Sequence, residues 1–569
     1  MYMPRKRAAV GVGQTDAMRP LPRPLSQPMS RRVLLCGGAA VAVAACSDGS
    51  DSTNPTASTT PPTDTTVTAT AAPTTTMPAS TTSVMVDVQL VGDPFTLGIA
   101  SGDPDATSVV LWTRLAPEPY TGGGMPADDI DVLWEVSATD DFTEIAYSGT
   151  ETATAAHGHT VHAIAKLDQG DWFYRFRVGA YISPVGITRP APAPDAPLAQ
   201  AKFAAASCQN ITAGYYAAHR DIVGQRPDFT VWLGDYIYEG AGVPFDPNAT
   251  TREHIGDEPT TIDGYRNRYG QYKSDPQLQA SHAICPWFVI WDDHEVENNY
   301  AGLTPQEPAD EAGFQARRFA AYQAWWEHQP VRLDPPVSAD EEYRIYRDSQ
   351  WGDLIELALL DTRQYRSNQA CGDITLSTDP PCAEALDPTR TMLGAEQEQW
   401  LLDTLSASTS AWNLLGNQVV LADATFDGAV LNFDQWDGYP FERARLLQAF
   451  ADNDVQNLVV VTGDIHLAAV GQLRAGDSGT GINVGAEFIT TSISSSGNID
   501  EGLADILRTF PALVDAELAH RGYTLHTVTP ERWTADYRIV TDVSNPNSDV
   551  TTYGTYTVEA GSSTVVKAI

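Results

Sequence analysis

Basic residues are scarce in this chain of 569 residues, which has 35 lysines and arginines against 73 aspartates and glutamates. The formal net charge is −38 at pH 7, and the isoelectric point is about 4.4. A protein that holds nucleic acid needs a basic surface opposite the phosphates, so we expect no stable nucleic-acid partner. An acidic excess instead favours solubility outside the cell, and clustered carboxylates can hold cations.

Cysteine is rare as well, with six residues, two of which fall in the N-terminal segment. Cys371 and Cys382 flank a loop that contains proline and aspartate, and outside the cytoplasm this spacing predicts a disulfide. Cys285 lies in an apolar run and is expected to be a buried thiol.

The apolar run near the N-terminus, residues 37–45, is too short to span a membrane as a permanent helix. It follows Arg31-Arg32, a pair that resembles a twin-arginine export signal. Residues 43–46, Val-Ala-Ala-Cys, also resemble a lipobox, in which Cys46 would carry a lipid anchor to the membrane; cleavage without lipid is the alternative. We therefore expect export by twin-arginine machinery to the cell envelope or the medium.

Composition and periodicity divide the chain into segments. The Ser/Thr/Pro-rich stretch that follows the signal has too few apolar side chains to fold, whereas short alternating runs after it predict an immunoglobulin- or fibronectin-like β-sandwich. Beyond a linker rich in proline and alanine, strands alternate with helical patterns, as in a layered α/β domain. The expected segments are signal 1–46, linker 47–85, β-sandwich 86–190, linker 191–201, α/β domain 202–540 and C-terminal segment 541–569.

Each of four short apolar runs is followed at once by side chains that bind metals. The clearest is 229–233, which reads as a buried central strand and leads to Asp235 and Tyr238. Ligands collect at the carboxyl ends of strands, and carboxylates gathered there would repel one another without a cation. The other three runs, 203–206, 285–291 and 458–462, lead to Cys208, to Asp293 and His294 with Asn298 and Asn299, and to Asp464 and His466.

The order of these motifs resembles the PhoD-type alkaline phosphatases, a branch of the calcineurin-like metallophosphoesterases. The resemblance covers the chain from Val88 to the C-terminus and implies an α/β metallophosphoesterase domain, a β-sandwich flanked by helices. Its motifs are Ser-Cys-Gln-Asn (207–210), Gly-Asp-Tyr-Ile-Tyr-Glu (234–239), Trp-Asp-Asp-His-Glu-Val-Glu-Asn-Asn-Tyr (291–300), Leu-Asp-Thr-Arg-Gln-Tyr-Arg (360–366) and Gly-Asp-Ile-His (463–466).

The resemblance implies ferric iron and calcium as cofactors. Thiolate and phenolate ligands hold iron in the ferric state, as a Lewis acid rather than a redox centre, and calcium takes oxygen ligands. For calcium it implies Asp235 as a ligand shared with iron, together with Asp293 and Asn299, with Asn298 as the alternative to Asn299. The iron ligands carried over from the family are Cys208, Asp235, Tyr238, Asp464 and His466.

The same resemblance implies hydrolysis of phosphate monoesters or diesters by a metal-bound hydroxide or oxide, which would release phosphate for scavenging. No nucleophilic serine motif is present, so no phosphoenzyme is implied. His294 is expected to help at the leaving-group oxygen. Arg363 is our candidate phosphate clamp, since a guanidinium binds phosphate oxygens in pairs, with Arg268 and Arg366 as rivals; a structural ion pair is the alternative for all three.

Two other functions stay open at this point. One is a phospholipase D-like phosphodiesterase on the same scaffold, and the other is a non-catalytic surface protein that binds a partner through its β-sandwich. The sequence does not decide between monoester, diester and phospholipid, nor does it fix the oligomeric state, for which a monomer is our working expectation.

Overall fold

The computed structural model describes residues 90–243, 252–306, 311–372, 380–476, 481–497 and 501–568. They belong to the unit 44–569, the second of the two into which the chain divides. The expected export signal, its Cys46 and the linker 47–85 lie outside the described residues. Within the described ranges, no helix is both long and apolar enough to cross a membrane.

A ten-stranded sheet carries the first three strand ends. Its middle strands β9, β10, β11 and β1 are parallel neighbours, and the remaining pairs are antiparallel. In sheet order its strands are β22 (Val565–Lys567), β21 (Val550–Glu559), β20 (Arg532–Val540), β19 (Arg521–Val528), β9 (Ala201–Ala206), β10 (Phe229–Leu233), β11 (Trp287–Ile290), β1 (Ile99–Asp105), β2 (Ser108–Arg114) and β5 (Thr160–Lys166).

A seven-stranded sheet carries the fourth strand end. Here β13, β14, β15 and β17 are parallel, and the edge strands are antiparallel. Side chains such as Val231 and Leu359, one from each sheet, share a single apolar core, so the two sheets form a sandwich. In sheet order the strands are β12 (Arg347–Trp351), β13 (Ile355–Leu359), β14 (Trp412–Asn417), β15 (Leu458–Thr462), β17 (Ile482–Ile489), β16 (Ala468–Ala475) and β18 (Leu513–Glu517).

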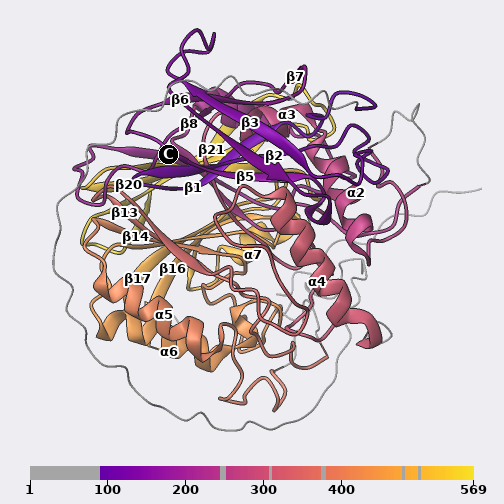
Figure 1. Ribbon diagram of the computed structural model, residues 1–569. Helices are drawn as coiled ribbons and strands as arrows, with labels where there is room; N and C mark the ends of the chain where they lie inside the picture. Colours follow the sequence, from indigo (N-terminus) through magenta and orange to yellow (C-terminus); the bar gives the residue numbers. More distant parts are fainter. Residues whose placement is uncertain are drawn as a thin grey trace, which may run out of the picture. The chain divides into compact units, whose positions relative to one another are not determined.

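Helices cover both outer faces of this sandwich. In Figure 1, α5 (Gly394–Ala407) and α6 (Pro440–Asp452) lie together beside the seven-stranded sheet, where Leu401 and Phe450 enter a second apolar core with Val460 of β15. The helices that pack on the ten-stranded sheet bury aromatic side chains such as Tyr269 and Trp325. They are α1 (Ala217–Gln225), α2 (Ile262–Lys273), α3 (Pro276–His282) and α4 (Glu311–His328); a short α7 (Ala504–Leu507) contacts β18.

The N-terminal segment forms a β-sandwich with an apolar core of its own, but the expected immunoglobulin-like form is not confirmed. A five-stranded sheet packs over β2 and β5 through side chains such as Leu111 and Phe176. However, β1, β2 and β5 belong to the ten-stranded sheet, because β1 pairs in parallel with β11. A Cβ at Gly102 would stand 2.5 Å from the carbonyl oxygen of Trp287, so only glycine allows this close pairing. The five-stranded sheet contains β4 (Tyr147–Ala153), β3 (Ile130–Ser137), β6 (Trp172–Val178), β7 (Tyr181–Ile182) and β8 (Gly186–Thr188).

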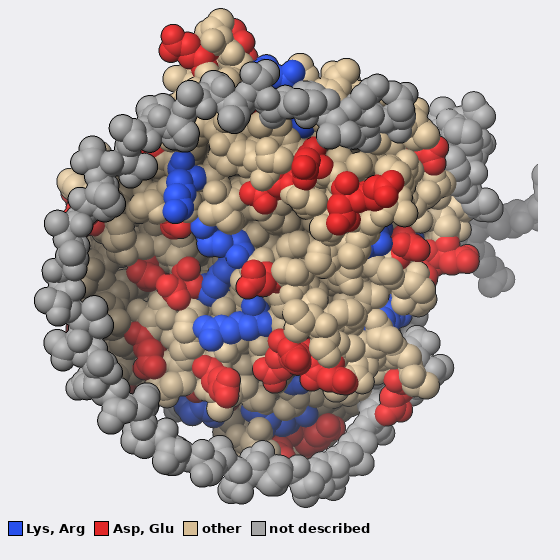
Figure 2. Space-filling model, viewed as in Figure 1, with Lys and Arg blue, Asp and Glu red and all other residues tan. Residues whose placement is uncertain are grey.

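The charge of the chain is visible on its surface. Acidic side chains are spread over the face in Figure 2, and the basic side chains there lie among them. Some of the few basic side chains form ion pairs within the fold, such as Arg347 with Asp103 at 2.7 Å.

Candidate metal centre

Four of the five candidate iron ligands stand on turns with left-handed backbone. Cys208 after β9, Asp235 after β10, and Asp464 and His466 after β15 have φ values of 58°, 56°, 65° and 55°. Residues other than glycine adopt this conformation at a cost, and it persists where surrounding contacts fix it. The parallel strands and the facing sheet bring these turns to one edge of the sandwich.

Gly234 allows the ends of β10 and β11 to meet. Its φ is +103°, and a Cβ built there would lie 2.4 Å from the Cβ of Asp292. Both the backbone conformation and the lack of space therefore require glycine. The contact places Asp235 beside the acidic residues that follow β11.

The first cluster joins Cys208, Asp235 and His466, whose ligand atoms all lie within 4.8 Å of one another. The Tyr238 hydroxyl donates to Asp235 Oδ2 at 2.9 Å and lies 2.9 Å from His466 Nε2. His466 Nδ1 lies 2.8 Å from the carbonyl oxygen of Ser496, and an Nδ1–H donated there leaves Nε2 as the ligand atom. Four of the five predicted iron ligands thus converge.

Two further clusters follow from the first through shared members: Asp235 links the first to the second, and Asp293 links the second to the third. Asp235, Asp293 and His294 form one group, and Asp292, Asp293 and Asp464 form the other, each with ligand atoms within 4.8 Å. Asp235 stands in two clusters, which is the position of a bridging ligand. Asp464, predicted as an iron ligand, lies with the acidic residues after β11 rather than in the cluster that contains Cys208.

Asn299 and Asn298 both stand at the edge of this acidic region. The backbone N–H of Asn299 donates to Asp293 Oδ2 at 2.6 Å, and the residue has a φ of 55°. The backbone N–H of Asn298 donates to Glu239 Oε1 at 2.8 Å. The contacts do not select one of the two as the calcium ligand, so that choice stays a prediction.

Arg363 lies inside the site but faces carboxylates. Its side chain has no exposed surface, and its guanidinium forms a bidentate pair with Asp292. It also pairs with Asp434 at 2.9 Å and with Asp464 at 3.2 Å. These contacts favour the ion-pair alternative over the phosphate clamp, because every side of the fork already has an acidic partner.

The two rival arginines are also turned toward the protein. Arg366 pairs with Asp434, and Arg268 donates to the backbone carbonyl of Tyr238. Both side chains are buried. The described contacts therefore leave none of the three arginines directed at a substrate.

His294 is placed to carry a proton. Its Nδ1 lies 2.7 Å from Glu239 Oε2, and its ring packs on Tyr238 with the ring centroids 4.1 Å apart. Burial lowers the pKa of His294, but the charges of Glu239, Asp235 and Asp293 outweigh burial and hold that pKa well above its usual value. The side chains of His294 and Asp464 keep 19% and 15% of their surface exposed, so the site opens to solvent on this side.

Five other groups of the site are hard to ionise in the protein alone, whereas the pKa of Asp293 is lowered, because the charges of Arg363 and His294 outweigh its burial. Burial, together with the neighbouring carboxylates, raises the pKa of Asp235 and of Asp292 well above the usual range, and it raises that of Asp464 to about 7. Burial and the charge of Asp235 do the same to Cys208 and Tyr238. Asp235 Oδ1 and Asp293 Oδ1 are buried without a hydrogen-bond partner. A cation would satisfy these oxygens and offset the repulsion, so the residues present fit metal ions.

Comparison with known proteins identifies the family. The profile of the PhoD-like phosphatases matches residues 203–537, more than half of the chain, and the profile of their N-terminal domain matches residues 79–192. Alkaline phosphatase D of Bacillus subtilis (strain 168) is 42% identical over 473 residues, which cover 81% of this chain and 80% of that protein. The chain belongs to the PhoD-like phosphatase family.

Solved structures agree with this assignment. A structure described as that of PhoD superposes with a TM-score of 0.80 and 40% identity, over 85% of this chain and 93% of the other. Purple acid phosphatase PPD1 from seeds of yellow lupin (Lupinus luteus) superposes with a TM-score of 0.51 and 11% identity, over 81% and 74% of the two chains, and shows the shared metallophosphoesterase fold. The resemblance stated from the motifs is confirmed, and with it the prediction of a phosphoric ester hydrolase.

Several residues of the site were not expected from the sequence. Glu295 accepts hydrogen bonds from the amides of Asp235, Tyr236 and Asp292 and so fixes the ends of β10 and β11 to each other. Asp292 and Glu295 belong to a motif that was identified from the sequence, but no role was predicted for either residue. Asp434 follows residues 429–433, Ala-Val-Leu-Asn-Phe, in which Asn432 interrupts the apolar side chains, so it was not recognised as a strand end.

Proposed function

We propose that this PhoD-like phosphatase is an exported, metal-dependent alkaline phosphatase/phosphodiesterase that uses ferric iron and calcium. Its role would be to release phosphate from esters outside the cytoplasm. The observation that carries the proposal is the position of Asp235, which belongs both to the cluster with Cys208 and to the cluster with Asp293, and whose buried Oδ1 has no hydrogen-bond partner.

Iron and calcium are assigned to neighbouring ligand sets. Thiolate, phenolate and imidazole beside carboxylates suit ferric iron, and the oxygen-rich groups after β11 suit calcium. When bound, these ions would supply Lewis acidity toward the phosphate ester and toward water. The iron set is Cys208, Asp235, Tyr238, Asp464 and His466, of which Asp464 stands in the adjacent acidic cluster, and the calcium set is Asp235, Asp293 and Asn299, with Asn298 as the alternative.

The protein's own groups support hydrolysis in two ways. His294, held protonated by Glu239 and its acidic neighbours, can donate a proton to the leaving-group oxygen from the solvent-facing side of the site. Arg363 holds the side chains of Asp292 and Asp464 in place, and its charge favours their ionised forms against the effect of burial, which keeps the acidic clusters assembled before a substrate arrives.

The test compares two aspartate variants. Asp235→Asn removes the shared ligand and should abolish both metal content and hydrolysis of p-nitrophenyl phosphate. Asp515→Asn is the matched control, because Asp515 is a buried carboxylate bound by Tyr556 and Lys567, outside the three clusters. Full activity in Asp235→Asn would overturn the proposal. Bis(p-nitrophenyl) phosphate and phosphatidylcholine, assayed beside the monoester, measure the substrate preference; no observation favours the phospholipase D-like alternative.

A further inference from the structure

The Cys371–Cys382 disulfide and the buried Gln369 beside it form a support for the acidic region of the site. The disulfide expected from the sequence is confirmed. Gln369 stands two residues before it, is 3% exposed, and donates from Nε2 to the carbonyl oxygen of Asn299 at 2.7 Å and to Asp434 Oδ1 at 2.8 Å. One side chain therefore binds both a candidate calcium ligand and the anchor of Arg363.

Asn299 needs such support because its backbone is left-handed, with a φ of 55°. Its backbone N–H donates to Asp293, and its carbonyl oxygen accepts from Gln369 at 2.7 Å and from Arg366 at the longer distance of 3.5 Å. A non-glycine residue keeps this conformation only where contacts on both sides fix it. Loss of the Gln369 contact would let the Asn298-Asn299 turn relax away from Asp293.

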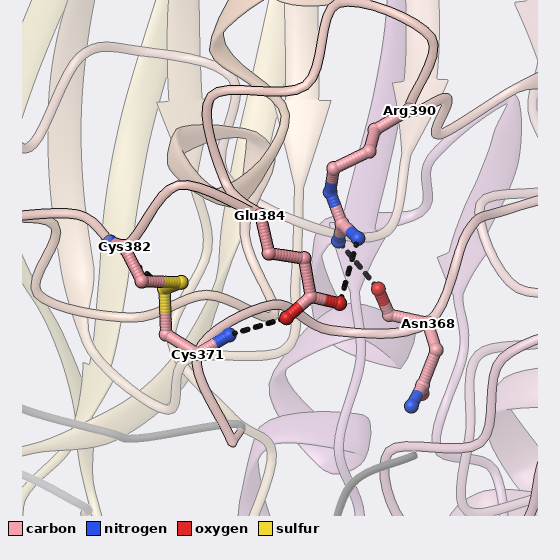
Figure 3. Close-up of a disulfide and its surroundings, with 5 residues drawn as sticks. All are labelled: Asn368, Cys371, Cys382, Glu384 and Arg390. Carbon is pink, nitrogen blue, oxygen red and sulfur yellow. Dashed lines mark hydrogen bonds and ion pairs between the residues drawn. A yellow bond between two sulfur atoms is a disulfide. The ribbon is translucent and has the colours of Figure 1, made fainter. Parts of the chain in front are cut away.

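The disulfide fixes the segment that carries Gln369. Figure 3 shows Glu384 between the Cys371 amide, at 3.3 Å, and the guanidinium of Arg390, at 3.5 Å. Arg390 donates in turn to the carbonyl oxygen of Asn368. The residues directly before the disulfide are thus held by residues directly after it.

A small apolar cluster contains the neighbours in sequence of Gln369 and of its partner Asp434. Ala370 and Ala385 pack with Val430 and Phe433, and the two disulfide cysteines pack against the same cluster. Phe433 directly precedes Asp434, so the cluster positions the aspartate as well as the glutamine. The disulfide holds one edge of this cluster together.

We propose that Gln369, held in place by the Cys371–Cys382 disulfide, is a positioning residue for calcium at the Asn298-Asn299 turn. The inference rests on the proposed calcium set and goes beyond it, because it makes calcium affinity depend on a residue that binds no metal. Groups that hold a metal ligand in orientation commonly change metal affinity ten- to a hundredfold.

The experiment measures calcium binding by calorimetry to the iron-containing protein, with the visible absorption of the iron as a second readout. Gln369→Met keeps the volume and removes the donors, so we expect calcium affinity to fall roughly ten- to a hundredfold while the iron band is unchanged. Gln364→Met is the matched control, since Gln364 is also buried in this loop but donates to Tyr343 and Asp361.

A second variant tests the role of the disulfide without a reducing agent. The double variant Cys371→Ser, Cys382→Ser should also lower calcium affinity. Added to Gln369→Met, it should lower the affinity by less than it does alone, because both changes act through one contact. If the parent protein binds calcium and Gln369→Met binds it with the same affinity, this inference is overturned while the proposed calcium set stands. A parent protein that binds iron but no calcium would overturn the inference together with the proposed calcium set.

Discussion

Arg363 and Asp292 form a buried bidentate ion pair that joins the loop after β13 to the end of β11. The two residues are 71 positions apart in the chain. Asp434 and Asp464 complete the acidic surroundings of the same guanidinium. Its charge therefore stabilises three carboxylates inside the protein, of which Asp434 also pairs with Arg366.

We therefore expect Arg363→Met to damage the metal centre rather than substrate binding. Removing one partner of a buried pair leaves uncompensated charge and typically costs about 3–5 kcal/mol. Metal content and the free energy of unfolding should both fall, as measured by elemental analysis and denaturant titration. A variant with normal metal content and stability, but weaker inhibition by inorganic phosphate, would restore Arg363 as the phosphate clamp.

Gly234→Ala should separate the ends of β10 and β11. The new Cβ would meet Asp292 at 2.4 Å on a backbone with a φ of +103°. We expect a loss of at least about 2 kcal/mol of stability and reduced metal content. Gly170→Ala is the control, since Gly170 has a φ of +131° but nothing within 4 Å of its Cβ. Equal stability losses in the two variants would show that the close approach to Asp292 has no effect of its own.

The fold could be predicted from the sequence where one strand or helix face is buried. The apolar runs at Phe229–Leu233 and Leu458–Thr462 predicted β10 and β15 with their observed ends. Periodicity reports which face of a strand is buried but not which strand lies beside it. The pairing of β1 with β11, which merges the expected N-terminal sandwich into the main sheet, therefore went unseen.

The site was predictable to the same degree. Motif order predicted which residues carry metal-binding side chains, and the structure brings Cys208, Asp235, Tyr238 and His466 together. Ion pairs between loops far apart in sequence leave no local pattern. For that reason the acidic surroundings of Arg363 could not be foreseen.

Buried neutral histidines should make the protein sensitive to acid. Burial lowers the pKa of His219 and His526 to about 3 and that of His162 and His254 to about 4. Below pH 6.5 the unfolded state, with a histidine pKa near 6.5, binds protons that the folded state does not bind. This stability is present above about pH 6.5 and is lost as the pH falls toward the folded values, by up to about 1.4 kcal/mol per pH unit for each histidine.

The measurement is the free energy of unfolding between pH 8 and pH 4. His526→Gln should make its pH dependence shallower by about one proton. Phe488→Leu, a change in the ring that packs on His526, is the control and should lower stability equally at every pH. An unchanged slope in His526→Gln would contradict the role given to burial.

Export is the prediction that concerns the segment before the fold. Replacing Arg31-Arg32 with two lysines should leave the precursor uncleaved inside the cell, because the twin-arginine pathway reads the pair. Cell fractionation with an antibody to the folded domain measures the result, and Arg23→Lys is the control outside the pair. Normal export of the double-lysine variant would remove the assignment.

The central claim is a centre of ferric iron and calcium built on Asp235. Elemental analysis of the purified protein, together with its visible spectrum, tests it most directly. The account predicts iron and calcium in the parent protein, a broad absorption band from phenolate or thiolate charge transfer to ferric iron, and loss of the band in Asp235→Asn. A colourless, active protein that contains zinc or manganese in place of iron would contradict it.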